Sequence, residues 1–226
     1  MRNTLFAVCA VAAVLTVVII SASWADVIIT LKNGKTIKVD VDKKDIVSIS
    51  FDEKPGHGPG PGPGHRPGGN WDFESGTLNG WTATGTAFNT QPTYGDNPTA
   101  RNRGQASNHQ GNYWIGGYEN RPSPSHTAGA IQGDGPQGTL TSNPFPIRKE
   151  NIRFLIGGGC DMNSVRAELI VDGQMVRQST GRCNETMFED SWDVSAFRGK
   201  HGQIRLVDNA SGGWGHINFD YVRFTD

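Results

Sequence analysis

The segment from Asp208 to His216 gathers side chains that could do chemistry. It reads Asp-Asn-Ala-Ser-Gly-Gly-Trp-Gly-His and places a carboxylate, an amide, a hydroxyl, an indole and an imidazole on a glycine-rich turn between two strand-like runs. Fixed donors and acceptors beside an apolar ring suit a shallow pocket for a small polar ligand. Carboxylates and arginines strengthen such a pocket because they form charge-assisted hydrogen bonds.

Motifs for catalysis are missing from the sequence. There is no Gly-x-Ser-x-Gly, no His-Glu-x-x-His and no free cysteine beside a histidine. The triplet Gly157 to Gly159 is not a phosphate loop, because no Lys-Ser or Lys-Thr follows, and it predicts instead that two backbones approach closely. One enzymatic alternative stays open, in which Glu119 and Glu185 act as the acid and base of a glycosidase. We expect a protein that is not an enzyme.

Residues 1–25 are typical of a secretory signal peptide. Arg2 precedes an apolar run from Leu5 to Ile20, and Ser23 and Ala25 supply the small residues at −3 and −1 of a cleavage site. The alternative is a retained anchor, although about 16 apolar residues fall short of the ~20 that span a bilayer. We expect export, to the extracellular medium, the periplasm or the cell surface, with no stable membrane insertion once the leader is removed.

Two cysteines, Cys160 and Cys183, remain after the leader is removed, and each lies in a glycine-bearing turn. In an exported chain an even pair predicts a disulfide, which would close a loop of about 22 residues and contribute roughly 3 kcal/mol. Two free thiols or a metal pair are the alternatives.

Charge and composition exclude several classes of protein. Of the 226 residues, 21 are Lys or Arg and 22 are Asp or Glu, so losing Arg2 with the leader leaves 20 basic against 22 acidic residues, a net of −2. No basic field points to nucleic acid or to an anionic membrane. The 30 glycines and 12 prolines lack a collagen repeat, and the 19% of charged residues disfavours a wholly disordered chain.

The chain beyond the leader divides into three parts. Residues 26–53 alternate in the manner of strands around Asn33-Gly34, a strong hairpin signal, and form an element too small to bury a core alone. Residues 54–70 are a linker, with seven glycines and five prolines between Pro55 and Gly69. Residues 71–226 hold 17 aromatic residues, enough to fill the core of one domain.

This domain shows short strand-like runs between turn signals and no sustained helical period. The turn Asp172-Gly173 predicts a hairpin after Val165 to Val171. We predict an all-β sandwich or barrel. The expected strands are residues 81–88, 113–118, 139–142, 152–156, 165–171, 203–207 and 217–224.

Several stretches of residues 71–226 resemble a known family. These are Phe154-Leu-Ile-Gly-Gly-Gly, Val171-Asp-Gly-Gln-Met-Val-Arg, Ser191-Trp-Asp-Val-Ser and Gly212-Gly-Trp-Gly-His-Ile-Asn-Phe-Asp, together with the opening Asp72-Phe-Glu-Ser-Gly. They are similar to the galactose-binding-like jelly rolls appended to fructan-degrading glycoside hydrolases, the levan-binding carbohydrate modules. The resemblance implies a jelly-roll β-sandwich. It leaves the ligand open, because no hydrolase domain accompanies it and a cysteine lies in each of two loops.

The resemblance also implies site residues. Trp214 and His216 are the leading sugar contacts, and their structural alternatives are a core plug and a histidine bonded to a backbone carbonyl. Further candidates for ligand binding are Glu185, Arg182 and Glu119, each with a solvated surface charge as its alternative, and Asp208. Jelly rolls of this type often hold a structural calcium, for which Glu74 and Asp220 would be ligands.

The expected function is therefore an exported, non-catalytic protein whose jelly roll binds an extracellular polysaccharide or oligosaccharide, such as a fructan, through its glycine-rich loops. The alternative is an interaction protein of the cell surface or extracellular space. In that case the same fold meets a protein partner and residues 26–53 complete a partner's sheet.

Overall fold

The computed structural model describes residues 69–226 and, before them, six short strands. The chain forms two compact units, residues 1–60 and 61–226. No helix among the described residues is long and apolar enough to cross a membrane.

In the first unit, strands β5 and β6 form an antiparallel pair in which Thr30 lies opposite Thr36. The two strands flank the turn of the predicted hairpin, but this Asn33-Gly34 turn, the predicted strand at 46–51 and most of the predicted linker lie outside the described residues. Four short strands fall within the predicted leader, and β4 pairs with β5. The bounds are β1 (Phe6–Ala7), β2 (Ala10–Val11), β3 (Ala13–Val14), β4 (Thr16–Val18), β5 (Ala25–Thr30) and β6 (Thr36–Val41).

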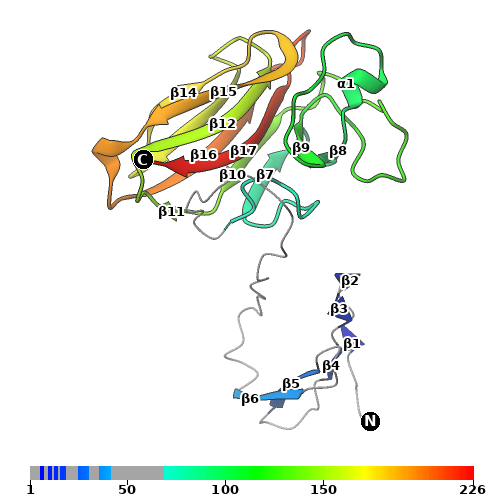
Figure 1. Ribbon diagram of the computed structural model, residues 1–226, viewed down its shortest axis with the longest axis vertical. Coiled ribbons are helices and arrows are strands. Elements are labelled where there is room, and N and C mark those ends of the chain that lie inside the picture. The colour runs from blue at the N-terminus through cyan, green and yellow to red at the C-terminus, as the bar shows by residue number, and fades with distance from the viewer. Residues whose placement is uncertain are drawn as a thin grey trace. The chain divides into compact units, whose positions relative to one another are not determined.

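The second unit is a β-sandwich of two antiparallel sheets, drawn in Figure 1. One sheet has the order β14-β13-β16-β10-β7, with β11 paired to β16, and the other has the order β15-β12-β17-β9-β8. From β12 onward the chain crosses between the sheets repeatedly, which is the jelly-roll arrangement, so the predicted fold class is confirmed.

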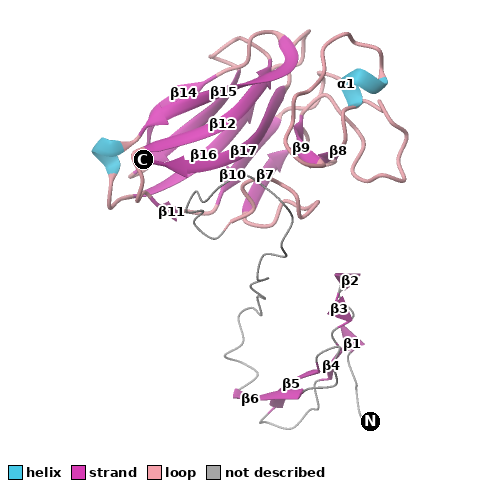
Figure 2. Ribbon diagram, in the orientation of Figure 1, coloured by secondary structure: helices cyan, strands magenta, loops and turns pink. Residues whose placement is uncertain are grey.

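Strands dominate the described part of this unit, residues 69–226, and the two helices found there are single turns (Figure 2). The elements are β7 (Trp81–Gly85), β8 (Thr93–Tyr94), α1 (Asn97–Ala100), β9 (Tyr113–Gly116), β10 (Gly138–Ser142), β11 (Phe145–Pro146), β12 (Asn151–Gly158), β13 (Val165–Val171), β14 (Gln174–Ser179), β15 (Asn184–Asp193), the 3-10 helix η2 (Ser195–Phe197), β16 (His201–Asp208) and β17 (Ile217–Thr225).

The core lies between the two sheets and is rich in aromatic side chains. Trp71 packs edge-on against Phe145 and Phe224, with ring centroids 5.1 and 5.2 Å away. Phe154 contacts both Trp192 and Phe219. These buried rings come from both sheets and from the segment before β7, so the core fixes the positions of the loops at the sandwich ends.

A bulge interrupts β17 opposite β12. The pairing shifts between Arg153 and Leu155, and Tyr221 takes a left-handed conformation with φ 53°. The alternation of inward and outward side chains breaks here. Asp220 is therefore buried completely.

Candidate ligand-binding site

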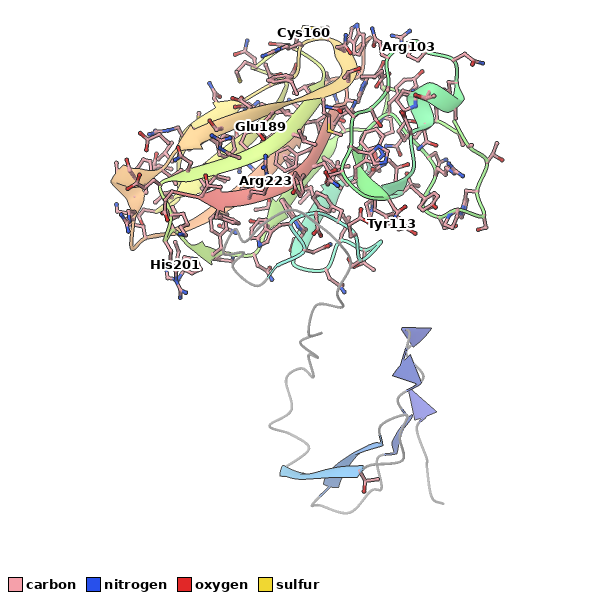
Figure 3. All side chains as sticks on the ribbon, in the orientation of Figure 1. Arg103, Tyr113, Cys160, Glu189, His201 and Arg223 are labelled. Carbon is pink, nitrogen blue, oxygen red and sulfur yellow. A yellow bond between two sulfur atoms is a disulfide. The ribbon has the colours of Figure 1, made fainter. Side chains whose placement is uncertain are left out.

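A pocket of about 320 Å³ opens where loops from both sheets meet. Two arginines follow α1, a tyrosine follows β9, and the carboxylate of Glu185 comes from the start of β15. Figure 3 labels Arg103 beside the pocket and Cys160 near the same end of the domain, with His201 at the opposite end. The lining residues are Arg101, Arg103, Tyr118, Asp134, Glu185, Gly213, Trp214 and His216.

His216 lies between two carboxylates in the wall of the pocket. Its Nδ1 is 2.7 Å from Oδ1 of Asp134, and its Nε2 is 3.5 Å from Oε2 of Glu185. Burial lowers the pKa of His216, but the contacts with Asp134 and Glu185 outweigh burial and raise this pKa to about 9. The imidazole is therefore a cation at neutral pH.

Glu185 is only 2% exposed and is surrounded by donors. Nδ2 of Asn218 donates to its Oε2 at 3.2 Å, and Nη2 of Arg101 lies 3.6 Å from its Oε1. Burial raises the pKa of Glu185, but His216, Asn218 and Arg101 together leave it below the ordinary value. The pocket thus presents an ionised carboxylate.

Trp214 supplies the aromatic surface of the pocket. Its ring is half-buried and lies 5.6 Å from the ring of His216. The guanidinium carbon of Arg103 lies over the Trp214 ring, 5.4 Å from its centroid, which is cation–π distance. Trp214 has φ 66°, a conformation that non-glycine residues seldom adopt. The surrounding loop holds the indole in place at some conformational cost.

Buried polar atoms without hydrogen bonds gather in this region. Four such side-chain atoms occur in the part of the chain that the structure describes, and three belong to Asp208, His216 and Asn218. They are Oδ1 of Asp208, Nε2 of His216 and Oδ1 of Asn218, and the fourth is Nε of Arg223. These atoms are shut off from solvent, and a buried polar group without a partner costs about 1–3 kcal/mol.

Glycines and the disulfide hold the loops behind the pocket together. A Cβ on Gly158 would lie 2.5 Å from the carbonyl oxygen of His216, and one on Gly159 would lie 2.3 Å from that of Trp214. The close backbone approach that the glycine triplet predicts is therefore present. The predicted disulfide between Cys160 and Cys183 is also confirmed, with a Cα–Cα distance of 5.0 Å, and it ties this layer to the start of β15.

Three predicted contact residues meet in the pocket, and three do not line it. Trp214, His216 and Glu185 line the pocket. Asp208 is buried at the end of β16, where burial raises its pKa to about 7. Glu119 is completely buried and paired with Arg101, so it acts behind the pocket wall. Arg182 instead stacks over Phe188, 3.5 Å from the ring centroid.

Sequence reasoning missed Arg101, Arg103, Tyr118 and Asp134. Arg101 and Arg103 follow the short helix α1, and Asp134 precedes β10, so none of the three lies in a segment with strand periodicity. Tyr118 directly precedes Glu119, a candidate in its own right, and is the one residue of the four that a signal could have found.

The candidate calcium residues, Glu74 and Asp220, hold the same loop. Oε1 of Glu74 accepts backbone N–H groups of Asn112 and Tyr113 at 2.8 and 2.7 Å, and Oδ2 of Asp220 accepts that of Gln110 at 2.7 Å. Burial raises the pKa of Asp220 well above its ordinary value, and the charge of Glu74 adds to this effect.

Neither carboxylate forms an ion pair within residues 69–226. No cluster of three or more His, Cys, Asp or Glu side chains suited to a metal occurs among the described residues, so a calcium here would also need backbone oxygens.

Comparisons with known proteins give one curated relative. No protein-family profile matches the chain. The relative is a "Putative glycosyl hydrolase ecdE" from Aspergillus rugulosus, 36% identical over 153 residues. The match covers 68% of this chain and 20% of the relative, so the chain spans about a fifth of that protein's length.

Among solved structures, similarity is low throughout. A family 35 carbohydrate-binding module from an environmental isolate has TM-score 0.27 and 15% identity, covering 45% of this chain and 75% of the module. A chain from a study of promiscuous carbohydrate-binding modules of the β-sandwich superfamily has TM-score 0.33 and 12% identity, covering 90% and 73%. The K2 adhesin domain of Lys-gingipain has TM-score 0.36 and 15% identity, covering 69% and 97%.

Proposed function

We propose that the pocket binds a carbohydrate, and that the protein is an exported, non-catalytic glycan-binding protein. The observation that carries the proposal is a pocket that combines the half-buried indole of Trp214 with charged groups held in place on Arg101, Glu185 and His216. A sugar offers both complements, because its hydroxyl groups donate and accept hydrogen bonds while its C–H face packs on an aromatic ring.

The charges of the pocket support a ligand rich in hydroxyl groups. Arg101 and His216 are each shared between carboxylates, so their N–H groups are fixed in direction before a ligand arrives. Fixed donors and acceptors reduce the entropy lost on binding. A single site of this size is expected to bind with micromolar to millimolar affinity, about −8 to −4 kcal/mol.

The non-catalytic part of the proposal is supported by where the two candidate catalytic carboxylates lie. Glu185 lines the pocket, whereas Glu119 is fully buried and engaged by Arg101. An acid and a base for glycoside hydrolysis must both face the scissile bond. Incubating the protein with each glycan that it binds and measuring released reducing sugar tests this point, and turnover would overturn it.

More specifically, we propose that the glycan is a fructan. This part of the proposal rests on the resemblance of residues 71–226 to levan-binding modules. The test is a glycan array that includes levan and inulin, probed with the purified protein and followed by calorimetry on each hit. Selective binding of fructans supports the finer proposal. Binding of another glycan class keeps the carbohydrate function and removes the fructan.

The variant Trp214→Ala decides whether the pocket is the binding site. Loss of the ring should weaken binding at least fivefold, since stacking and burial of an aromatic face contribute about 1–3 kcal/mol. Phe197→Ala is the matched control, because Phe197 is also half-buried and lies 5.2 Å from a guanidinium, that of Arg177, in the helix η2. Equal affinity in both variants would mean that the glycan binds outside this pocket, whereas silence of the folded protein across the array would move the function to a protein partner.

We also propose that Glu74 and Asp220 hold a calcium ion that stabilises the 110–113 loop. Support comes from two carboxylates that share this loop and lack a cationic partner within residues 69–226. The ion would supply positive charge and no chemistry. Running the array with calcium and again with chelator separates its structural effect from sugar binding.

A further inference from the structure

A row of three side chains crosses the wall of the pocket in the order Asp134, His216, Glu185. Asp134 contacts Nδ1 of the imidazole at 2.7 Å, and Glu185 faces Nε2 at 3.5 Å. The contact with Asp134 has hydrogen-bond geometry, whereas Nε2 makes no hydrogen bond with any described residue. The ring is therefore anchored at one nitrogen and unsatisfied at the other.

The two carboxylates decide the protonation state of the ring. A neutral imidazole has one N–H, so one of its nitrogens would direct a lone pair at a carboxylate oxygen. Only the imidazolium presents an N–H to both. The other charged groups near His216 are Asp208 and Glu119, which both interact with it electrostatically, and Arg101, which contacts Glu185. The rings of Tyr118 and Trp214 complete its surroundings.

Asp134 reaches this position from outside the elements that carry the other two residues. It lies between Gly133 and Gly135 in the segment before β10, whereas Glu185 is in β15 and His216 precedes β17. Its side chain is 21% exposed and lines the pocket, so it orients the ring without a backbone link to it.

We infer that Asp134 is a positioning residue of the binding site: it holds the His216 imidazolium with Nε2 directed at Glu185, so that both charged groups of the pocket wall are fixed before a ligand binds. This inference rests on the proposed carbohydrate function. A sugar hydroxyl that donates to a carboxylate held in this way forms a charge-assisted hydrogen bond. Charge-assisted hydrogen bonds of this kind are about twice as strong as neutral ones.

The first test does not need a ligand. The ¹⁵N signals of the His216 imidazole report its protonation and tautomer across a pH titration of the full protein. In the wild type we expect an imidazolium that titrates near a pKa of about 9. In Asp134→Asn the midpoint should fall by about 1–2 pH units, because one of the two carboxylates is gone. An unchanged midpoint would overturn the inference.

The second test measures binding of a levan oligosaccharide, or of the glycan that the array identifies, between pH 6 and pH 10. Wild-type affinity should hold to about pH 8 and fall as His216 loses its proton. The fall should begin earlier in Asp134→Asn, with roughly a tenfold lower affinity at pH 8.5, and Asp134→Glu should restore much of it. Asp172→Asn is the matched control, since Asp172 is exposed and pairs with Lys200.

These outcomes separate the two proposals. If the wild type binds no glycan, the proposed function fails, and the ligand-free titration still decides the role of Asp134. If the glycan binds and Asp134→Asn has the affinity and pH profile of the wild type, the function stands and the inference is overturned. A uniform loss of affinity with an unchanged profile would also overturn it, because a merely structural role predicts that result.

Discussion

Arg101 and Glu119 form a two-pronged ion pair directly behind the pocket. Both nitrogens of the guanidinium end contact the carboxylate, and Nη2 donates to Oε1 at 2.9 Å. Glu119 is completely buried, while Arg101 is partly exposed and lines the pocket. Glu119 therefore determines where a pocket donor points although it does not line the pocket.

The first prediction concerns Glu119→Gln. Removing the charge leaves Arg101 with a weaker partner, so affinity for the glycan should fall about fivefold to twentyfold and stability by about 2–4 kcal/mol. Calorimetry and urea denaturation measure the two effects. Glu189→Gln is the control, because Glu189 also bonds two arginines, Arg153 and Arg223, but on the exposed face of a sheet. Equal behaviour of the two variants would contradict the role given to Glu119.

The second prediction concerns the disulfide. Cys160 follows the glycines that pack on Trp214 and His216, and Cys183 precedes Glu185 by two residues. Replacing both cysteines by serine should cost roughly 3 kcal/mol of stability. It should also weaken glycan binding several-fold, because both loops that present the site are released. The check is calorimetry well below the melting temperature of the variant. Wild-type affinity in a folded double variant would show that the bond stabilises the fold alone.

The third prediction is a pH dependence of stability from Asp208. Burial raises the pKa of Asp208 from 3.8 to about 7, so the folded state binds this proton more tightly than the unfolded state. The stabilisation that the protonated Asp208 gives the folded state is complete below pH 3.8 and is lost as the pH rises to about 7.

The substitution Asp208→Asn removes the group whose ionisation lowers the free energy of unfolding at high pH. The variant should match the wild type near pH 4 and exceed its free energy of unfolding at pH 8 by about 4 kcal/mol at most. Urea denaturation at the two pH values gives the difference, with Asp172→Asn as the exposed counterpart. A gain of the same size at both pH values would refute the assignment to this titration.

The fourth prediction concerns calcium. Adding calcium to chelator-treated protein should raise the melting temperature by several degrees, since a bound ion stabilises the folded state by mass action. Glu74→Gln and Asp220→Asn should each abolish that rise. Asp161→Asn serves as the comparison, because Asp161 is an exposed carboxylate that caps its own turn. Identical melting curves of the wild type with and without calcium would contradict the proposed calcium site.

The sequence predicts most of the sandwich because its strands carry local signals. The run Val165 to Val171 forms β13, and its turn at Asp172 has the left-handed backbone, φ 51°, that such hairpins need. Two expected strands are shorter than predicted and end at Gly85 and Gly116. A Cβ on Gly85 would lie 2.2 Å from a carbonyl oxygen, so the chain turns there.

The strand β15 escaped prediction altogether. It runs from Asn184 to Asp193, but its buried residues, which include Glu185, Met187 and Trp192, do not keep a strict period of two. Glu185 is buried because His216 offsets its charge and Asn218 donates a hydrogen bond to it, and Asn218 lies 33 residues further along the chain. Partners that distant leave no local pattern.

The residues of the candidate site also fall into two groups, those that the sequence predicts and those that it does not. Trp214 and His216 are adjacent to glycines on one turn, and this local composition is visible in the sequence. Arg101 and Asp134 meet them through long-range packing of segments without regular structure. Whether Arg101 and Asp134 belong to the site depends on how the loops fold over the ends of the sheets.

The glycines packed behind the pocket mark positions that cannot accept a side chain, in contrast to exposed positions around the pocket that can. Gly158, Gly159 and Gly181 press backbone against backbone, so any side chain placed there would displace the carbonyls of Trp214 and His216 or the neighbouring strand. By contrast, Arg103 reaches the pocket from a solvent-facing segment and has room to change. Selection for a new ligand would act on exposed positions such as Arg103, while the glycine positions would stay fixed although no ligand touches them.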